Sequence, residues 1–236
     1  MQYWAHTRLT HNYINKDMRT KLVLGAVILA AGLATSMAQN VYSLNVVGYY
    51  NVTAAGSGYT LMANQLTTAS GTNGLNEVLT SAADGSQVLT YANSAYNVDV
   101  SIGGAWFDNV TTAPTKTTLS PGQGFFFYNA GATAPVTFVG QVPQGALSVK
   151  LQPNYTLVGN PYPAVLDLSS NSFPQADGMQ YLSFVNNAYN IDISIGGAWF
   201  DNVTTAPATV APGVGQGYFI YNPGALSTWT INFTVQ

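Results

Sequence analysis

Residues 93–114 read NSAYNVDVSIGGAWFDNVTTAP, and residues 186–207 read NNAYNIDISIGGAWFDNVTTAP. The two stretches begin 93 residues apart and are identical at 19 of 22 positions. A match of this length within one chain indicates a tandem duplication. Shorter matches follow in the same order: GYTLMAN at 58–64 corresponds to NYTLVGN at 154–160, and GQGFFFYN at 122–129 corresponds to GQGYFIYN at 215–222.

The repeated stretch predicts a β-hairpin, because apolar residues alternate with polar ones from Tyr96 to Ile102. Gly103-Gly104 supplies the two positive-φ positions of a type I′ turn, and a two-residue loop fixes the register. The predicted pairs are Ile102 with Ala105, Ser101 with Trp106, Val100 with Phe107 and Asp99 with Asp108. We expect the face with Phe107 to be core, and the face with Trp106 to be peripheral or to lie between the units.

The composition favours an all-β protein, since Tyr, Phe, Val and Thr are abundant among 23 Gly and 11 Pro. We predict two homologous tandem β-sandwich-like units, 39–139 and 140–236, packed directly together without a linker. Four successive aromatic residues, Phe125–Tyr128, predict a strand buried on both faces. The strand at Val136–Val142 ends the first unit and is also a candidate to open the second, and a short helix is predicted at Leu75–Leu79.

The N-terminal residues 1–38 are interpreted as an upstream segment followed by a signal peptide helix. Arg19 and Lys21 precede an apolar run of 13 residues, Leu22–Ala34, which is too short to span a bilayer. Ser36-Met37-Ala38 then provides small residues for a cleavage site, and Met18 is an alternative start. The predicted location is therefore secreted, extracellular or in the cell envelope, with no membrane span left after cleavage.

The residues after position 38 carry two lysines, Lys116 and Lys150, against eight acidic residues, so their net charge is −6. This balance excludes a binder of nucleic-acid phosphates, which needs a basic surface. The same residues contain no His, Cys or Arg, which removes the usual catalytic triads, thiol nucleophiles and histidine metal sites. We therefore predict a protein that is not an enzyme and carries no cofactor.

Two kinds of candidate site remain on the hairpins. An exposed tryptophan flanked by Asp and Asn could stack on a sugar ring, although packing against a neighbouring strand or unit is the simpler alternative. The candidate ligand-binding residues are Trp106, Asp108, Asn109, Trp199, Asp201 and Asn202. Opposed carboxylates could instead bind Ca²⁺ or simply point into water. The candidate calcium ligands are Asp99, Asp108, Asp192 and Asp201, but they include no EF-hand loop and too few oxygens for a complete site.

Several motifs also carry a resemblance. YTLVGNPYP at 155–163, followed by PGVGQGYF at 212–219, resembles a W-N-L-x-G-N-P-Y-P … P-G-Q-G-F-F module of exported Bacteroidetes proteins. VVGYYNV at 46–52 is similar to small secreted tandem-repeat proteins of the Verrucomicrobia and Planctomycetes type. The resemblance covers 41–236 and implies an extracellular β-rich module without known catalysis. The first unit departs from it, with Asn64-Gln65-Leu66 in place of Asn-Pro-Tyr-Pro.

These observations predict a secreted, non-catalytic structural or adhesive protein of a bacterial cell surface or extracellular matrix. Carbohydrate binding through the Trp106 and Trp199 faces is the alternative. The expected partners are a polysaccharide, another cell-surface protein or a second copy of the chain, and not nucleic acid.

The first prediction concerns processing. Protein exported by the producing bacterium should begin at Gln39, because the small residues before that position suit a signal peptidase. Intact-mass spectrometry of the exported form tests this. An exported form that still contained residues 22–34 would show that the apolar run is an anchor instead.

Overall fold

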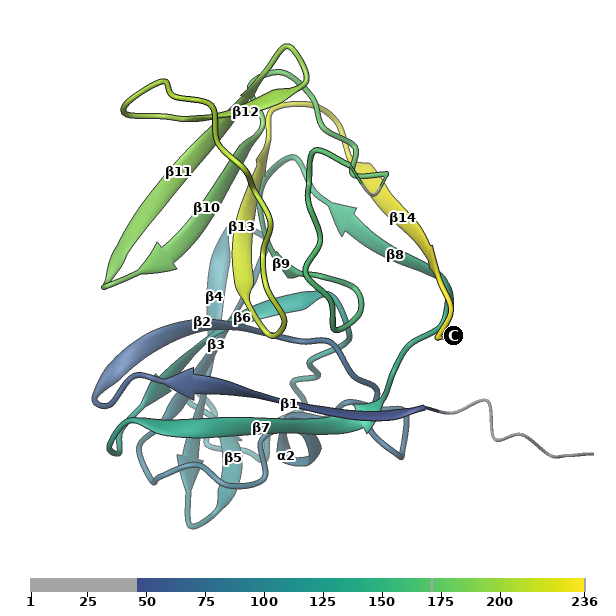
Figure 1. Cartoon of the computed structure of the whole chain (residues 1–236). Coiled ribbons are helices and arrows are strands. Elements are labelled where there is room, and N and C mark those ends of the chain that lie inside the picture. Colours follow the sequence, from purple (N-terminus) through teal and green to yellow (C-terminus); the bar gives the residue numbers. More distant parts are fainter. Residues whose placement is uncertain (1–45, 171, 236) are drawn as a thin grey trace, which may run out of the picture. The chain divides into compact units, whose positions relative to one another are not determined.

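A computed structural model describes residues 46–170 and 172–235, which belong to one body that extends over Asn45–Gln236 (Figure 1). These residues form fourteen strands and one short helix, so the fold is all-β, as the composition and the period-two patterns predict. The predicted signal peptide at 1–38 lies outside the described residues.

Each half of the body contributes seven strands. Those of the first half are β1 (Val47–Ala54), β2 (Gly58–Asn64), β3 (Gln87–Ala92), β4 (Ala95–Ile102), β5 (Ala105–Asp108), β6 (Gln123–Asn129) and β7 (Ala134–Gln141). Those of the second half are β8 (Gly145–Leu151), β9 (Asn154–Gly159), β10 (Gln180–Val185), β11 (Ala188–Ile195), β12 (Ala198–Asp201), β13 (Gly217–Asn222) and β14 (Ser227–Phe233). The helix is α2 (Leu75–Val78), a single turn where the sequence predicts a short helix.

Strand pairing produces three sheets. The largest has ten strands in the order β12-β11-β10-β13-β9-β6-β3-β4-β5, and β2 also pairs with β6. The two small sheets are β1 with β7 and β8 with β14. The order β2-β6-β3-β4-β5 in the first half corresponds strand for strand to β9-β13-β10-β11-β12 in the second. Consequently β5 and β12 are the two ends of the ten-stranded sheet, near the bottom and the top of Figure 1.

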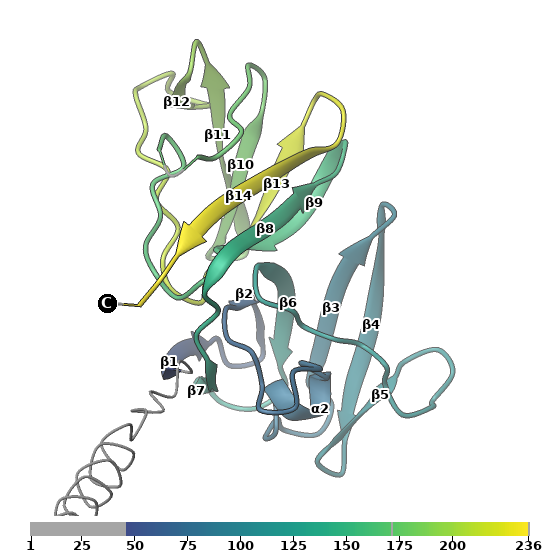
Figure 2. The ribbon, with the colours of Figure 1, turned by 90° about the vertical axis from the view of Figure 1, so that its right-hand side faces the viewer.

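Each two-stranded sheet covers one face of its half in a sandwich-like arrangement. Figure 2 shows β8 and β14 side by side in front of β9 and β13. The core of the second half includes Val149 of β8, Trp229 of β14 and Tyr218 of β13. In the first half, Phe138 of β7 and Phe125 of β6 belong to the equivalent core.

A third cluster lies on the other face of the ten-stranded sheet and joins the two halves. Its buried members are Leu61, Phe126, Leu157, Leu182 and Phe219. Because Phe125 and Phe127 belong to the first-half core while Phe126 belongs to the shared cluster, the central part of β6 is buried on both faces. This confirms the prediction drawn from its four aromatic residues.

The junction between the halves involves two different strands. Among the described strands, β7 pairs only with β1, and it ends at Gln141, two residues beyond the predicted boundary at 139. A separate strand, β8, pairs with β14. The expectation that Val136–Val142 opens the second half as well is therefore wrong.

Two glycine-containing turns bring the halves into backbone contact. Gln123 of β6 pairs with Val158 of β9, and Gln216 pairs with Met62 of β2 in the same way. The N–H of Gly159 donates to the carbonyl of Gly122 at 3.0 Å. The corresponding bond runs from the N–H of Ala63 to the carbonyl of Gly215 at 2.9 Å. The same contact is thus made twice with the halves exchanged, as in an isologous dimer interface.

These contacts leave no room for a side chain at Gly124 or Gly217. A Cβ at Gly124 would lie 2.5 Å from the carbonyl oxygen of Val158, and a Cβ at Gly217 would overlap the carbonyl oxygen of Met62. Both obstructing atoms are backbone, so rotation of a side chain cannot relieve the overlap. The Gly-Gln-Gly motif therefore serves the joining of the two halves.

The second prediction follows from this overlap. Gly217→Ala should lower the free energy of unfolding by about 2–3 kcal/mol, because the new methyl group must displace the β2 backbone. Gly74→Ala is the matched control, since its Cβ would meet nothing closer than 3.9 Å. Equilibrium unfolding in urea measures both, and equal midpoints for the two variants would contradict the assigned contact.

Candidate functional site

The repeated hairpin forms both ends of the ten-stranded sheet, as β4–β5 and as β11–β12. Its register is confirmed, because Asp99 pairs with Asp108 and Ser101 pairs with Trp106. Gly103 and Gly104 have φ values of +60° and +80°, as the predicted turn requires. The second copy has the same register, with Asp192 opposite Asp201.

The faces of the hairpin are the reverse of the prediction. Trp106 is only 2% exposed and Trp199 only 1%, whereas Ile102 is 54% exposed and Ile195 is 55% exposed. Phe107 is half-buried. The tryptophans therefore belong to the cores, and the Val-Ile-Phe face is the outer one.

The burial of Trp106 has a specific cause. Its indole N–H donates to the carbonyl of Leu79 at 2.8 Å, and its backbone N–H donates to Oδ1 of Asn76 in α2 at 2.9 Å. Its ring also contacts Phe127 edge-on, with centroids 6.4 Å apart. The helix and the chain that follows it thus cover this face of the hairpin. Because these residues are distant in sequence, the hairpin pattern alone does not predict that they bury Trp106.

Trp199 is also enclosed by the second half, but its buried indole N–H, unlike that of Trp106, has no hydrogen-bond partner among the described residues. The ring of Phe173 lies against it, with centroids 6.4 Å apart, and both residues belong to the second-half core. Neither indole presents a face to solvent on which a sugar ring could stack. The proposed stacking platforms are therefore absent from the described surface.

Asp108 and Asp201 organise the loops that follow β5 and β12. Oδ1 of Asp108 accepts bonds from the N–H groups of Val110 and Thr111 and from the Thr111 hydroxyl, at 3.1, 2.6 and 2.7 Å. The backbone N–H of Thr111, followed by its hydroxyl, stabilises the ionised form and lowers the pKa of the Asp108 carboxyl.

The second copy repeats these bonds. Asp201 accepts the corresponding bonds from Val203 and Thr204, which likewise lower its pKa. Asn109 and Asn202 lie exposed in the same two loops. The aspartates thus hold the shape of the loops.

The partners of these aspartates are more enclosed. Asp99 is 3% exposed and accepts a bond from the Thr117 hydroxyl at 2.6 Å, so it does not point into water as one interpretation expects. Burial and the neighbouring Asp201 carboxylate raise the pKa of Asp192. Within residues 46–170 and 172–235, no three His, Cys, Asp or Glu side chains lie close enough together to hold a metal ion.

An exposed apolar strip is the feature that the sequence prediction misplaced. Val100, Ile102 and Phe107 line a hollow of about 310 Å³ together with Asp108, Asn109 and Thr112. Val110 is 87% exposed in the adjoining loop, and Val203 is 88% exposed in the second copy. We name the outer faces of β4–β5 and β11–β12, with these loops, the hairpin patches.

The outer edges of β5 and β12 are covered by the returning chain. The N–H of Asp108 donates to the carbonyl of Ala113, and the N–H of Thr115 donates to the carbonyl of Trp106. The second copy repeats both bonds between β12 and residues 206–208. A partner at a hairpin patch would therefore meet side chains and not open backbone groups.

Comparison with protein-family models, curated proteins and solved structures finds no match to this chain. Among the residues described, no helix has both the length and the apolar character needed to cross a membrane.

The third prediction tests the reversed faces. Trp106→Ala should cost about 3–5 kcal/mol of unfolding free energy, as removal of a core aromatic side chain does. Phe107→Ala on the opposite face should cost less, because Phe107 already contacts solvent. Chemical denaturation of the two variants compares them, and a larger loss for Phe107→Ala would restore the face assignment predicted from the sequence.

Proposed function

We propose that this chain is a secreted structural or adhesive protein of a bacterial cell surface or extracellular matrix. In this proposal it consists of two homologous β-sandwich-like units packed directly together, each of which presents one hairpin patch. The observation that carries the proposal is the presence of the same exposed apolar surface at both ends of one sheet.

Packing explains only part of the identity between the two hairpins. Buried residues such as Trp106 are constrained by the core, but Val110 and Val203 are 87% and 88% exposed and have no such constraint. Other exposed positions 93 residues apart differ, such as Lys116 and Thr209. Retention of the same exposed residues in both loops therefore supports an interaction with a partner.

The chemistry of the hairpin patches suits contact with a macromolecule. Exposed apolar side chains grouped on one face are typical of interaction sites. Two equal sites on one chain allow simultaneous attachment, so weak single contacts combine into strong retention. The apolar leader run, the low charge and the resemblance to exported modules support a location outside the cell.

The alternative of carbohydrate binding through the tryptophans lacks this support. Both indoles are enclosed in the cores, and the outward face of each hairpin carries mainly aliphatic side chains. We therefore favour the structural or adhesive role.

The fourth prediction tests two-site attachment in the producing bacterium. The wild-type chain should be recovered with the cell surface or matrix, and the double variant Val110→Asp/Val203→Asp should appear mainly in the medium. Each single variant should be retained less than the wild type and more than the double variant, because one hairpin patch is intact but simultaneous attachment at two sites is lost. Quantitative immunoblots of cell, matrix and medium fractions measure the distribution.

Val165→Asp is the matched control, since Val165 is 64% exposed but lies outside the hairpin patches. It should behave as wild type. Wild-type protein found only inside the cell, or double and control variants with the same distribution, would contradict the proposed role.

A further inference from the structure

The edge of β7 that faces away from β1 carries backbone N–H and C=O groups that are open to pairing with a further strand. The N–H and C=O of Gln141 both bond to Thr67, on the side of β7 away from β1, at 2.7 and 2.9 Å. Residues alternate in direction along a strand, so Val139 and Thr137 direct their N–H and C=O groups to that same side. Among the described residues, no backbone hydrogen bond reaches these two positions from that side.

The strand begun by Thr67 stops at once. The chain turns away after it, with the N–H of Gly71 bonded to the carbonyl of Thr68 at 2.9 Å. Among the described residues, the place of a third strand beside β7 is therefore occupied only at the Thr67–Gln141 pair. It is empty beside Thr137 and Val139. A two-stranded sheet gains stability from a further strand, so this edge favours an added segment.

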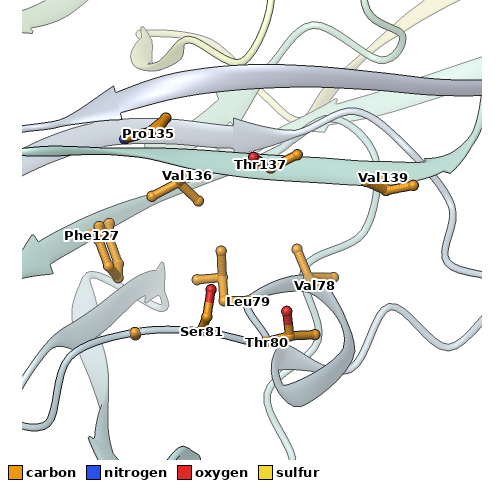
Figure 3. A pocket seen from close by; sticks show the side chains of 10 residues that line it. Val78, Leu79, Thr80, Ser81, Phe127, Pro135, Val136, Thr137 and Val139 are labelled. Atoms are coloured by element: carbon orange, nitrogen blue, oxygen red, sulfur yellow. The ribbon is translucent and has the colours of Figure 1, made fainter.

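A groove lies directly beside the vacant edge. One hollow of about 210 Å³ is lined by Val78, Leu79, Thr80, Ser81, Ala82, Phe127, Pro135, Val136, Thr137 and Val139. A second hollow of about 300 Å³ shares Phe127 and Val136 with it and continues toward Asn129. Figure 3 shows Val136 and Thr137 on β7 across the groove from Leu79 and Ser81. No charged residue lines either hollow.

The second half shows what fills such a space. The 93-residue spacing that relates Asp84 to Asp177 places Phe173 at the position of Thr80 and Trp229 at that of Val136. The rings of Phe173 and Trp229 lie edge to face with centroids 5.3 Å apart, and both are buried. The first half has a small side chain at each position, which leaves the groove open. An aromatic side chain is therefore the group that this space fits.

We propose that the β7 edge and its groove form a peptide-binding site. The occupant is an extended, uncharged segment of another protein that pairs with Thr137 and Val139 and inserts an aromatic side chain over Val136 and Phe127. The absence of charge from the groove excludes recognition by ion pairing. This site is distinct from the hairpin patches and does not depend on the surface role proposed above.

The fifth prediction uses a defined probe, the acetylated and amidated peptide Val-Thr-Trp-Thr-Val. Its two threonines would pair with Thr137 and Val139, and its tryptophan would point into the groove. NMR titration should give saturable shifts at the amides of Thr137 and Val139, with slower hydrogen exchange at both. Replacing the peptide's tryptophan by alanine should weaken binding about tenfold, as expected for the loss of one buried aromatic side chain.

Two matched controls distinguish binding by strand pairing from nonspecific hydrophobic binding of the peptide. Methylation of both threonine nitrogens of the peptide should abolish binding, because the donors to β7 are lost. In the protein, Thr137→Pro should abolish binding, whereas Thr230→Pro at the equivalent position of β14 should leave it unchanged. Circular dichroism establishes that both variants fold.

Filling the groove is the decisive variant. Thr80→Phe with Val136→Trp copies the second half and should abolish binding. If this variant does not fold, Thr137→Pro carries the test alone. Unchanged amide exchange with millimolar peptide, equal binding of the methylated peptide, or retained binding in the folded filled variant would overturn the proposal.

Discussion

The backbone approach of Gly124 to Val158, and of Gly217 to Met62, is the constraint on which the rest of the structure depends. It makes β6 and β9 neighbours and thereby joins two five-stranded arrangements into one sheet of ten. The apolar cluster around Phe126 and Phe219 forms only because this sheet is continuous. Unfolding of one half would expose that cluster, so the two halves should be thermodynamically coupled.

Continuity of the sheet also fixes the positions of the hairpins. β5 and β12 lie at the two ends of the same sheet. The helix α2 and Leu79 cover β5, and Phe173 packs against Trp199 of β12. The loops that follow them keep their shape through the hydrogen bonds of Asp108 and Asp201. The two hairpin patches are thus held by one framework, which is the geometric condition for a chain that attaches at two points.

The sequence pattern of the hairpin predicted its register. It could not predict which face of the hairpin is covered by residues distant in the sequence. The register of β4–β5 follows from Gly103-Gly104, because a two-residue turn leaves one pairing. Which face is core depends on α2 and Leu79, and nothing within the hairpin records their position.

The alternation of apolar residues from Leu147 to Leu151 is typical of a strand and corresponds to β8, although it is much weaker than the signal of the repeated hairpin. The β7 groove could not be predicted, because it depends on residues that only the fold brings together.

The returning segments beside β5 and β12 have a consequence for solubility. Only 6% of the residues are charged, so electrostatic repulsion between molecules is weak. In such a chain the ends of a ten-stranded sheet would be templates for stacking into fibrils. The bond from the Asp108 N–H to the Ala113 carbonyl, and the bond from the Thr115 N–H of the returning chain to the Trp106 carbonyl, occupy the outer edge of β5, and their counterparts occupy that of β12. Protection of these two sheet ends against amyloid growth therefore comes from the path of the chain and not from charge.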